Sequence, residues 1–414
     1  MEIGNYKKDK KIHLLSISQA MVVAAYRSFF YQLAHVVSRS ERSTDVALGI
    51  VAPHQFIELG GQLKSCEKFQ YPYTNHGLNR MGKVLKAKRF HVQTVLFRGL
   101  GKTIKQFLRS NKKGENIIFC MAEPYSVTSL LVWLTAFFVK RNQFKFFCIA
   151  TQNIYKDFAW PIKAIQGFVL KRCDGIFALG DEHEGVIRRS GYKGPFFSFP
   201  LWFNSDLFRP RPYSECVKVF SDLDLSILKG RKVLGFSGAL KEEKGIIDLL
   251  NFLKINHEKL KDQYAFVVCG YGPLESELKK SLEELMDLGL LTYFFGPLPA
   301  DKMPNFFSLC DILVVPSKTK KHWKEQFGRI IVEAKACGCS VVGSDSGEIP
   351  VVVDHPDYIF SEGNLAELGI AVEHAHAGLG LHEHKKRMIQ KNFEKYSDKA
   401  LASQFFQTIQ ELSL

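Results

Sequence analysis

The segment EQFGRIIVE, residues 325–333, brings together two carboxylates, a glycine and the start of a predicted helix. The apolar run DILVVPS before it predicts a buried strand, and the helical periodicity after it ends at Gly338. If the helix begins near Phe327 and Gly328, its free backbone N–H groups would face an anion such as a phosphate. The pattern therefore predicts an anion site at a strand-to-helix turn.

The two carboxylates of this segment suit the two ends of a sugar nucleotide. Glu333 follows Gly328 by five residues, which is about 7 Å along a helix at 1.5 Å per residue. This is about the reach from a diphosphate to a ribose, so we expect Glu333 to hold ribose hydroxyls and Glu325 to meet the group beyond the diphosphate. An amphipathic helix with two solvated glutamates is the simpler alternative for an isolated pair.

The wider stretch WKEQFGRIIVEAKACGCSVVGSDSGEIPVVV, residues 323–353, resembles the signature of family 4 retaining glycosyltransferases. The resemblance implies a GT-B fold, in which two Rossmann-like domains face an interdomain cleft. It also implies that Glu325 contacts the donor sugar in catalysis and that Glu333 binds the donor ribose. The backbone that would meet the donor diphosphate belongs to Gln326, Phe327, Gly328 and Arg329.

A second glycine-rich turn, GFSGALKEEKG at residues 235–245, follows a predicted strand and opens a helix. Backbone N–H groups and the Lys244 ammonium would converge at the edge of the sheet where open α/β folds bind ligands. The resemblance implies that this loop, with Gly238 and Ala239, holds the donor diphosphate and that Lys244 is catalytic. An arginine of the family falls at Ala239, so its charge would have to come from Lys241, Arg329 or Lys324. A solvated lysine is the simpler alternative for Lys244.

The turn GYGP, residues 270–273, is weak evidence alone, because GxG is common in turns. The resemblance places Gly270 and Gly272 near the nucleotide, and Phe295 and Gly296 beside its base. A nicotinamide cofactor is disfavoured, because the nearest carboxylate, Asp287, precedes the next strand instead of ending it.

Two polar segments of the first half, MAEPYS (121–126) and TQNIYK (151–156), each follow a predicted strand. The resemblance places a sugar-binding histidine of the family at Gln152 or Asn153, where an amide can still bind a hydroxyl. Glu123 is the nearest carboxylate on the expected acceptor side, and structural capping explains it equally well.

Strands and helices alternate along the whole chain, which predicts doubly wound parallel sheets of the α/β class. The polar turn FNSDLFRPRPYSE separates two domains, a Rossmann-like acceptor domain at residues 1–210 and a donor domain at 211–394. The resemblance implies that a crossover helix at about residues 395–414 belongs to the first domain.

Charge differs between the two halves. Residues 1–200 carry 30 Lys and Arg against 13 acids, and residues 201–414 carry 26 against 29. A basic half fits peripheral association with an anionic membrane, or simply a soluble basic face. Nucleic acid is not expected, because the lysines are dispersed and no recognised reading motif is present.

Several features argue against other classes. The nine cysteines are scattered through apolar runs, which favours reduced thiols and a cytoplasmic setting. The CxC of Cys337 and Cys339 lacks a partner pair, so we expect no zinc site. The resemblance implies that the reaction needs no metal and no cofactor. The same expectation treats a group of nearby histidines as solvated: His374, His376, His382 and His384.

The most apolar run, VTSLLVWLTAFFV at residues 127–139, is too short to span a bilayer and predicts a buried helix. The charged start MEIGNYKKDKK does not resemble a signal peptide. GLGKT, residues 99–103, lacks the first glycine of a phosphate-binding loop, so Lys102 is interpreted as surface charge.

These patterns together predict sugar transfer, with retention, from a nucleotide-diphosphate sugar to a hydroxyl of a glycan, glycolipid or small molecule. Surface polysaccharide or glycolipid synthesis is the expected setting. Two alternatives stay open: a nucleotide-sugar-binding protein without turnover, and a GT-B epimerase, hydrolase or phosphorylase.

Overall fold

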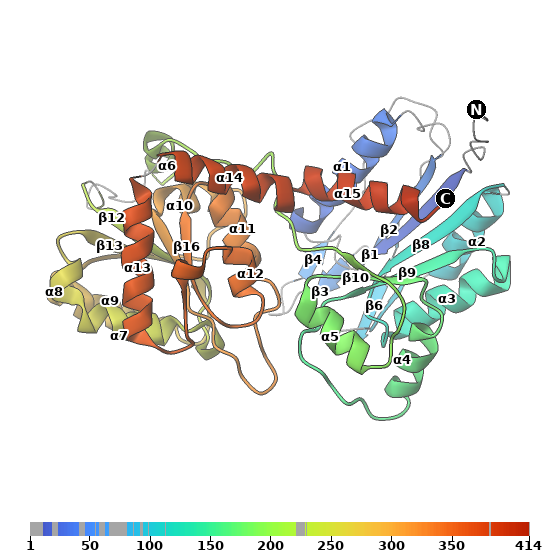
Figure 1. The fold of residues 1–414 in the computed structure, drawn as a ribbon, viewed down its shortest axis with the longest axis horizontal. Helices are drawn as coiled ribbons and strands as arrows, with labels where there is room; N and C mark the ends of the chain where they lie inside the picture. The colour runs from blue at the N-terminus through green and yellow to red at the C-terminus, as the bar shows by residue number, and fades with distance from the viewer. Residues whose placement is uncertain are drawn as a thin grey trace, which may run out of the picture. The chain divides into compact units, whose positions relative to one another are not determined.

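The computed structural model describes residues 11–18, 24–40, 46–53, 55–57, 63–65, 81–85, 87–91, 94–97, 99–111, 113–220, 228, 230–380 and 382–413. The chain forms two compact units, drawn in Figure 1. The first unit comprises Met1–Pro200 and Asp398–Leu414, and the second comprises Leu201–Ser397. The charged start of the chain, residues 1–10, lies outside the described residues.

The first unit is built on a seven-stranded sheet in the order β11-β10-β9-β8-β1-β2-β5, in which every pair is parallel. This confirms the α/β class predicted from the alternation of elements. The strand order reverses between β1 and β8, which are neighbours. The strands are β1 (Ile12–Ser18), β2 (Val46–Pro53), β5 (Met81–Leu85), β8 (Glu115–Met121), β9 (Lys145–Ala150), β10 (Gly175–Ala178) and β11 (Phe196–Ser198).

The helices of this unit are α1 (Ala24–Arg39), α2 (Leu100–Ser110), α3 (Val127–Lys140), α4 (Ile162–Leu170), α5 (Asp181–Arg189) and α15 (Asp398–Glu411). Two antiparallel pairs were not anticipated from the sequence. They are β3 (Gln55–Ile57) with β4 (Leu63–Ser65), and β6 (Ala87–His91) with β7 (Thr94–Phe97).

Aromatic packing fastens the last helix, α15, to the first unit. The ring centroid of Phe405 lies 5.0 Å from that of Phe119 and 5.2 Å from that of Phe177. Phe199 and Phe29 complete the contacts at 5.5 and 5.6 Å. Rings at these separations gain from offset and edge-to-face contacts in addition to burial. Phe405 is therefore a central core residue of this unit.

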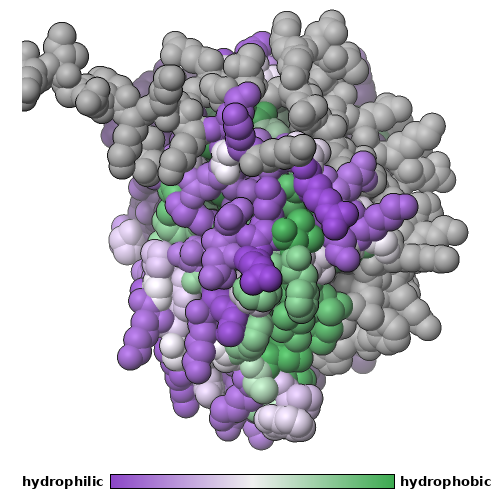
Figure 2. Space-filling view, turned by 90° about the vertical axis from the view of Figure 1, so that its right-hand side faces the viewer, coloured by the Kyte–Doolittle hydropathy of each residue, from purple (hydrophilic) through white to green (hydrophobic). Residues whose placement is uncertain are grey.

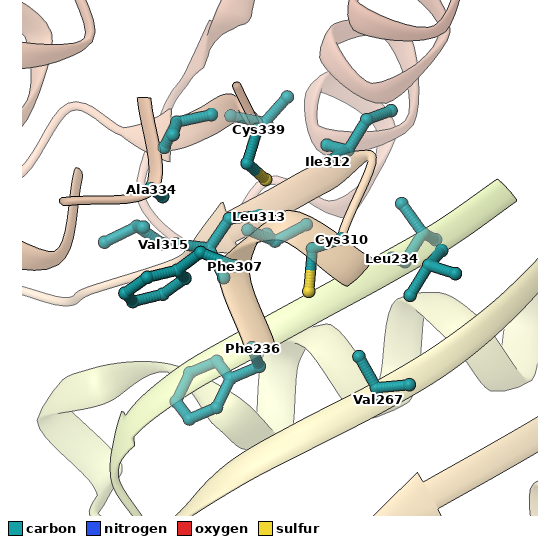
Figure 3. Close-up of a cluster of buried hydrophobic side chains, with 14 of the residues drawn as sticks. Leu234, Phe236, Val267, Phe307, Cys310, Ile312, Leu313, Val315, Ala334 and Cys339 are labelled. Atoms are coloured by element: carbon teal, nitrogen blue, oxygen red, sulfur yellow. The ribbon is translucent and has the colours of Figure 1, made fainter. Parts of the chain in front are cut away.

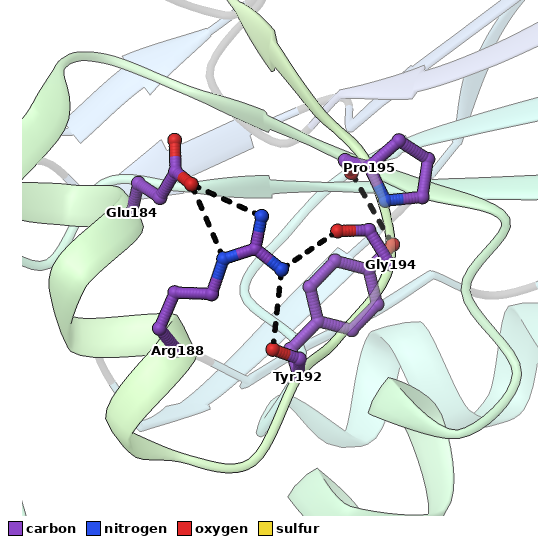
Figure 4. A network of polar contacts seen from close by, with 5 residues as sticks. All are labelled: Glu184, Arg188, Tyr192, Gly194 and Pro195. Atoms are coloured by element: carbon purple, nitrogen blue, oxygen red, sulfur yellow. Dashed lines mark hydrogen bonds and ion pairs between the residues drawn. The ribbon is translucent and has the colours of Figure 1, made fainter.

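The turn between α5 and β11 is held by one arginine, as Figure 4 shows. Arg188 donates to Glu184 Oε1 from Nε at 3.2 Å and from Nη2 at 3.1 Å. Its Nη1 donates to the carbonyl oxygen of Gly194 at 2.9 Å. These bonds fix the C-terminal end of α5, whose first turn lies at the carboxyl edge of the sheet.

The second unit contains a six-stranded sheet in the order β14-β13-β12-β15-β16-β17, again with parallel pairs only. Its strands are β12 (Lys232–Ala239), β13 (Tyr264–Tyr271), β14 (Leu291–Gly296), β15 (Ile312–Val315), β16 (Ser340–Ser344) and β17 (Ile359–Phe360). The chain starts at β12, adds β13 and β14 on one side, and then crosses to β15 on the other. This reversal between β12 and β15 is the switch point at which open α/β sheets bind ligands.

The helices of the second unit are α6 (Tyr213–Val219), α7 (Ile246–Ile255), α8 (His257–Leu260), α9 (Glu275–Asp287), α10 (Met303–Leu309), α11 (Arg329–Ala336), α12 (Ile349–Val353), α13 (Leu365–Leu379) and α14 (His382–Tyr396). Two short 3₁₀ helices accompany them, η4 (Glu242–Lys244) and η5 (Pro356–Tyr358).

Thiols belong to the apolar core of this unit, part of which is shown in Figure 3. Cys310 and Cys339 are buried among residues of β12, β13 and β15. A side-chain carbon on Gly235 would lie 2.5 Å from Cys310 Sγ, so the glycine makes room for the sulfur. Burial raises the pKa of both thiols, and the eight described cysteines are free. Seven of these eight cysteines are buried, as the sequence predicts for cysteines in apolar runs.

The division between the units falls at Pro200, earlier than the boundary expected near residue 210. Phe203 and Phe208 follow this point and belong to the core of the second unit. The backbone N–H of Phe203 also donates to the carbonyl oxygen of Tyr396 at 3.1 Å. Apolar packing therefore draws the first part of the predicted polar turn into the second unit.

The predicted C-terminal helical pattern is two helices, α14 and α15, separated at Ser397. Ser397 forms a parallel bridge with Phe203, which interrupts the helix. The units separate again at this residue, because α15 from Asp398 onward belongs to the first unit.

The prediction that residues 127–139 form a buried helix was only partly correct. The helix α3 is present, and Val132 and Ala136 are buried, but Leu131 and Phe138 are exposed. The reason is that α3 covers the sheet with one face while its opposite face is also apolar. None of the helices in the described parts of the chain is long and apolar enough to cross a membrane.

We expect Phe405→Ala to lower the free energy of unfolding by about 3–5 kcal/mol, because it removes a ring packed against four others. Urea unfolding of the full chain would measure the change. Gln404→Ala, on the exposed side of the same helix, is the matched control and should change stability by less than about 0.5 kcal/mol. Equal effects from both would show that α15 contributes no core packing.

Candidate functional site

Two helices begin at the switch point of the second sheet, and both have a glycine as N-cap. Gly245 precedes α7 with φ 68°, and Gly328 precedes α11 with φ 76°. Neither N-cap provides a side-chain acceptor. The N–H of Ile331 in α11 donates to the carbonyl oxygen of Gly328 at 2.8 Å, so an external anion would meet the N–H groups of Arg329 and Ile330 there, and those at the start of α7. The helix start at Gly328, where the sequence predicts an anion site, is therefore one of two glycine-capped helix starts.

The close approach of the two loops explains why residue 245 is a glycine. A side-chain carbon there would lie 1.7 Å from the carbonyl oxygen of Pro316, which directly follows β15. The loop after β12 thus packs without a gap on the loop after β15. This contact carries Lys244, the last residue of η4, toward the segment that contains Glu325.

Lys244 and Glu325, predicted separately from distant motifs, form an ion pair. Lys244 Nζ lies 2.6 Å from Glu325 Oε2, with 27% and 12% of their side chains exposed. Ser317 Oγ donates to the same oxygen at 3.0 Å, and the Trp323 ring centroid lies 4.6 Å from Nζ. The pair is thus shielded yet reachable, and a phosphate that entered here would share the ammonium with Glu325.

Ser317 and Trp323 contact the Lys244–Glu325 pair, and sequence reasoning did not single them out. Ser317 follows β15 within two residues, and polar residues at the carboxyl ends of parallel strands commonly face ligand sites. That position was a usable signal. The place of Trp323 depends on the path of an irregular loop, which no residue pattern specifies.

Glu333 is buried on α11, five residues after Gly328. Burial raises the pKa of its carboxyl, and Arg329 opposes this shift with Nε 3.1 Å from Oε1. The side chain of Arg329 is thus engaged one turn away, so it is a poor substitute for the charge missing at Ala239. Its backbone N–H is at the first position of α11, where the sequence predicts that it points out of the helix N-terminus.

Other cations lie on the loops around Ala239, the last residue of β12. Lys318 pairs with Asp248 at 2.8 Å, and Lys320 pairs with Glu242 at 3.4 Å. Lys241 is exposed on the same loop as Lys244. Among the predicted substitutes, Lys241 is joined to Lys244 through the backbone, because the N–H of Lys244 donates to the carbonyl oxygen of Lys241 at 3.1 Å.

Gly238 and Gly270 are paired residues of β12 and β13. A side-chain carbon on Gly270 would lie 2.0 Å from the carbonyl oxygen of Gly238, and one on Gly272 would lie 2.5 Å from that of Leu240. These glycines allow the two strand ends to lie together. Packing alone accounts for them, and their predicted place near the nucleotide stays a prediction.

The residues predicted to contact the donor through their backbone differ in where their side chains lie. Phe327 is buried, with its ring 5.6 Å from that of Tyr396, so only its backbone can face a ligand. Gln326 is half-buried. Phe295, at the end of β14, packs its ring 4.9 Å from Phe220, beside Gly296. The predicted base contact at Phe295 and Gly296 therefore stays untested.

Glu123, in the first unit, is buried just beyond β8. The backbone N–H and the hydroxyl of Thr151 donate to its Oε1 at 2.7 and 2.6 Å. Burial raises the pKa of this carboxyl, while the bonds from Thr151 lower it. Glu123 therefore ties the end of β8 to the end of β9, which favours the capping interpretation over direct contact with an acceptor.

Gln152 and Asn153 follow β9 at the same edge of the first sheet and are half-buried. Asn153 Nδ2 donates to Glu182 Oε2 at 3.3 Å, which links the edge to the first turn of α5. The structure thus gathers Glu123, Gln152 and Asn153 at the carboxyl edge of one sheet. The donor-side residues gather separately at the carboxyl edge of the other.

No three metal-ligating side chains converge within the described residues. The histidines of α13 and α14 have different neighbours. His374 Nδ1 lies 3.3 Å from the carbonyl oxygen of Asp357, and His376 bonds the hydroxyl of Tyr264. His384 lies beside His355 with ring centroids 5.6 Å apart.

Residues 222–395 match the family model described as glycosyl transferases group 1. This segment lies within the second unit and covers less than half of the chain. It contains the paired loops, the ion pair and Glu333. The second unit therefore carries a glycosyl transferases group 1 domain.

Curated relatives match over a limited length. A D-inositol 3-phosphate glycosyltransferase of Corynebacterium jeikeium is 32% identical over 155 residues, which is 36% of this chain and 36% of that protein. A lipopolysaccharide 1,2-N-acetylglucosaminetransferase of Salmonella typhimurium is 31% identical over 131 residues, or 30% and 33% of the two chains. The matches thus span about a third of the length of these relatives.

A solved structure matches nearly the whole chain. The Anabaena protein HepE in complex with UDP is similar with a TM-score of 0.62 and 15% identity, covering 97% of this chain and 100% of that one. A likeness at this identity concerns the fold. With two parallel-sheet units and this neighbour, the fold is GT-B, as predicted.

The raised pKa of Glu333 predicts a pH dependence of stability. In the window above the ordinary carboxyl value of 4.5, the folded protein binds more protons here than the unfolded chain, so stability falls as pH rises through the window. Glu333→Gln removes this loss. We therefore expect the melting temperature of the variant, relative to the original, to be higher at pH 7.5 than at pH 4.5.

Differential scanning calorimetry without ligand would measure both proteins at the two pH values. Glu277→Gln, an exposed glutamate of α9, is the control and should show no such trend. A difference that stays constant with pH would mean that Glu333 titrates normally in the fold.

Proposed function

We propose that the protein is a retaining glycosyltransferase of the hexosyltransferase class. It would move a sugar from a nucleotide-diphosphate sugar to an acceptor hydroxyl, as family 4 enzymes do. The observation that carries this proposal is the Lys244–Glu325 pair at the switch point, flanked by the open N-termini of α7 and α11. The match of residues 222–395 to the group 1 glycosyl transferases supports it.

The donor would lie along the carboxyl edge of the second sheet. The diphosphate takes the first-turn N–H groups of α7 and α11 together with the Lys244 ammonium. Glu333, one turn into α11, accepts hydrogen bonds from the ribose, which compensate the cost of its burial. Glu325 exchanges part of its contact with Lys244 for the hydroxyls of the sugar.

The transfer breaks the bond between the anomeric carbon and the diphosphate, and the electron pair leaves with the phosphate. The acceptor oxygen bonds that carbon on the same face, and its proton passes to the departing phosphate oxygen. Fixed charge and helix N–H groups stabilise the developing negative charge, which is the largest contribution expected of such a site. The scheme requires neither a protein base nor a bound metal.

The identity of the substrates is a separate part of the proposal. UDP-sugars are the first donors to test, since the HepE structure contains UDP. A hydroxyl of a glycan or glycolipid is the proposed acceptor, since one matched relative acts on lipopolysaccharide. We assign the acceptor to the first unit, with Gln152 and Asn153 as its polar contacts. We also propose that the protein acts in the cytoplasm.

A nucleotide-sugar-binding protein without turnover is the second candidate, and Ala239 is the observation that favours it. Without the arginine that the family has at this position, less positive charge stabilises the departing diphosphate. Donor binding depends less on this charge than departure of the diphosphate does. A GT-B epimerase, hydrolase or phosphorylase would instead release products without a glycosylated acceptor.

The deciding experiment combines binding with product analysis. Thermal shift with UDP-, GDP-, ADP- and dTDP-sugars should show stabilisation by one nucleotide class, because a ligand of the native state stabilises by mass action. Incubation of that donor with an acceptor panel should then give a glycosylated product with retained configuration. Binding without any product would favour the second candidate, and no shift with any donor would contradict the proposal.

Two variants test the division of roles. Glu333→Gln should raise the donor dissociation constant about tenfold or more, because it weakens a buried charge-assisted hydrogen bond. Glu325→Ala should lower kcat by about a hundredfold with less change in donor affinity. Calorimetric titration and initial rates would measure both, with Glu277→Gln as the unaffected control. Equal loss of affinity in the two variants would refute the assignment.

A further inference from the structure

The outer face of α3, in the first unit, is apolar. Leu131 is 41% exposed and Phe138, seven residues later on the same side of the helix, is 77% exposed. Leu134 lies between them on this stripe and is partly exposed. A surface helix normally turns polar residues outward, so this face lacks the pattern of a helix that meets only water.

The start of α4, the helix beside α3, also carries exposed apolar side chains. Trp160 is 82% exposed and precedes α4, and Ile162 in its first turn is 40% exposed. The ring of Trp133 on α3 lies 5.3 Å from that of Phe168 on α4, so the two helices are direct neighbours. Figure 2 views the side on which α3 lies and shows a band of apolar residues with hydrophilic residues along its left side.

Cationic side chains border this surface on both sides. On α2, which packs against α3, the exposed residues Lys102, Lys105 and Arg109 recur along one face. On the other side, at the end of α4, the Arg172 guanidinium lies 3.7 Å from the ring centroid of Phe168. The arrangement is an apolar ridge between two cationic edges.

Acidic groups near this surface are few and already engaged. Residues 99–172 contain twelve Lys and Arg against three acids, and α2, α3 and α4 contain no acid. Glu115 pairs with Lys145 at 2.6 Å, Asp157 pairs with Lys163 at 2.9 Å, and Glu123 is buried. The segment that forms this surface therefore carries nine more cations than acids.

We propose that this surface, formed by α2, α3 and the start of α4, docks on an anionic lipid bilayer. The apolar ridge of Leu131, Phe138, Trp160 and Ile162 enters the boundary between headgroups and acyl chains, as monotopic proteins do. Tryptophan suits this depth because its ring is amphipathic. The cationic edges meet the acidic headgroups.

A bilayer fits this surface better than a second copy of the chain. A two-fold symmetric contact places the same patch against itself, so the cationic edges of two copies would repel each other. An anionic bilayer complements both the ridge and its edges. The inference goes beyond the proposed transfer reaction, because docking requires neither donor nor acceptor.

Vesicle flotation of the full chain tests the proposal. We expect binding to vesicles of phosphatidylcholine and phosphatidylglycerol in equal parts, and much weaker binding to phosphatidylcholine alone. Phe138→Ser and Trp160→Ser should each lower the partition coefficient about tenfold, because each removes one large side chain from the acyl boundary.

The cationic edge is tested separately with Lys102→Gln, Lys105→Gln and Arg109→Gln combined. At about fivefold per cation near an acidic surface, the triple variant should bind on the order of a hundredfold more weakly. Added salt should weaken the binding of the original protein in the same direction.

Ile255→Ser is the matched control, because Ile255 is 71% exposed but lies on α7 in the second unit. It should leave vesicle binding unchanged. Melting temperatures should stay within a few degrees for all of these exposed substitutions, which shows that each variant is folded.

Absence of vesicle binding by the original protein would overturn the proposal, as would equal losses from Phe138→Ser and Ile255→Ser. A dimer seen by light scattering that is lost in Phe138→Ser, with no vesicle binding, would assign the surface to a second copy instead. Donor-induced thermal shifts, measured in parallel, report on the transfer site and separate failure of docking from failure of the proposed function.

Discussion

The contact between Gly245 and the carbonyl oxygen of Pro316 is the constraint on which the candidate site depends. It closes the space between the loops after β12 and β15, and thereby brings Lys244 to Glu325 across 81 residues of sequence. It also sets the start of α7 beside the loop that leads to α11. A larger residue at position 245 would separate the ammonium, the carboxylate and the helix N-termini together.

Each unit has a buried carboxylate among the predicted site residues. Glu333 and Glu123 both lie at carboxyl edges, and burial raises the pKa of each carboxyl. The two differ in their partners: Thr151 supplies two hydrogen bonds to Glu123, whereas Glu333 has a charge contact with Arg329. The bonds from Thr151 give Glu123 Oε1 the environment of a structural carboxylate, although its buried Oε2 has no hydrogen-bond partner. The contact with Arg329 offsets part of the cost of burying Glu333.

Local sequence signals predicted much of this arrangement. The β-branched runs and the glycines after them gave the strands and loops of the second sheet, and two motifs located Lys244 and Glu325. Their pairing could not be predicted, because it depends on how closely two distant loops pack. For the same reason Trp323, on an irregular loop, was missed. Arg329 was expected as a substitute for the charge missing at Ala239, but its side chain pairs with Glu333 instead.

Periodicity also failed in an instructive way at α3 and at the C-terminus. An apolar run specifies that a helix forms but not how many of its faces are covered, so α3 was expected to be buried. The division of the C-terminal helical pattern at Ser397 could not be predicted from residue types, because it coincides with a backbone bridge to the distant Phe203. Both outcomes depend on contacts between residues far apart in the chain.

The discontinuity of the first unit has a consequence for the order in which the protein forms during synthesis. The ribosome completes residues 201–397, the whole of the second unit, before it makes Phe405, whose ring contacts four others in the core of the first. Synthesis at about 5–20 residues per second allows the second unit to fold while the first still lacks its last helix. The N-terminal half of this chain is therefore the half that matures last.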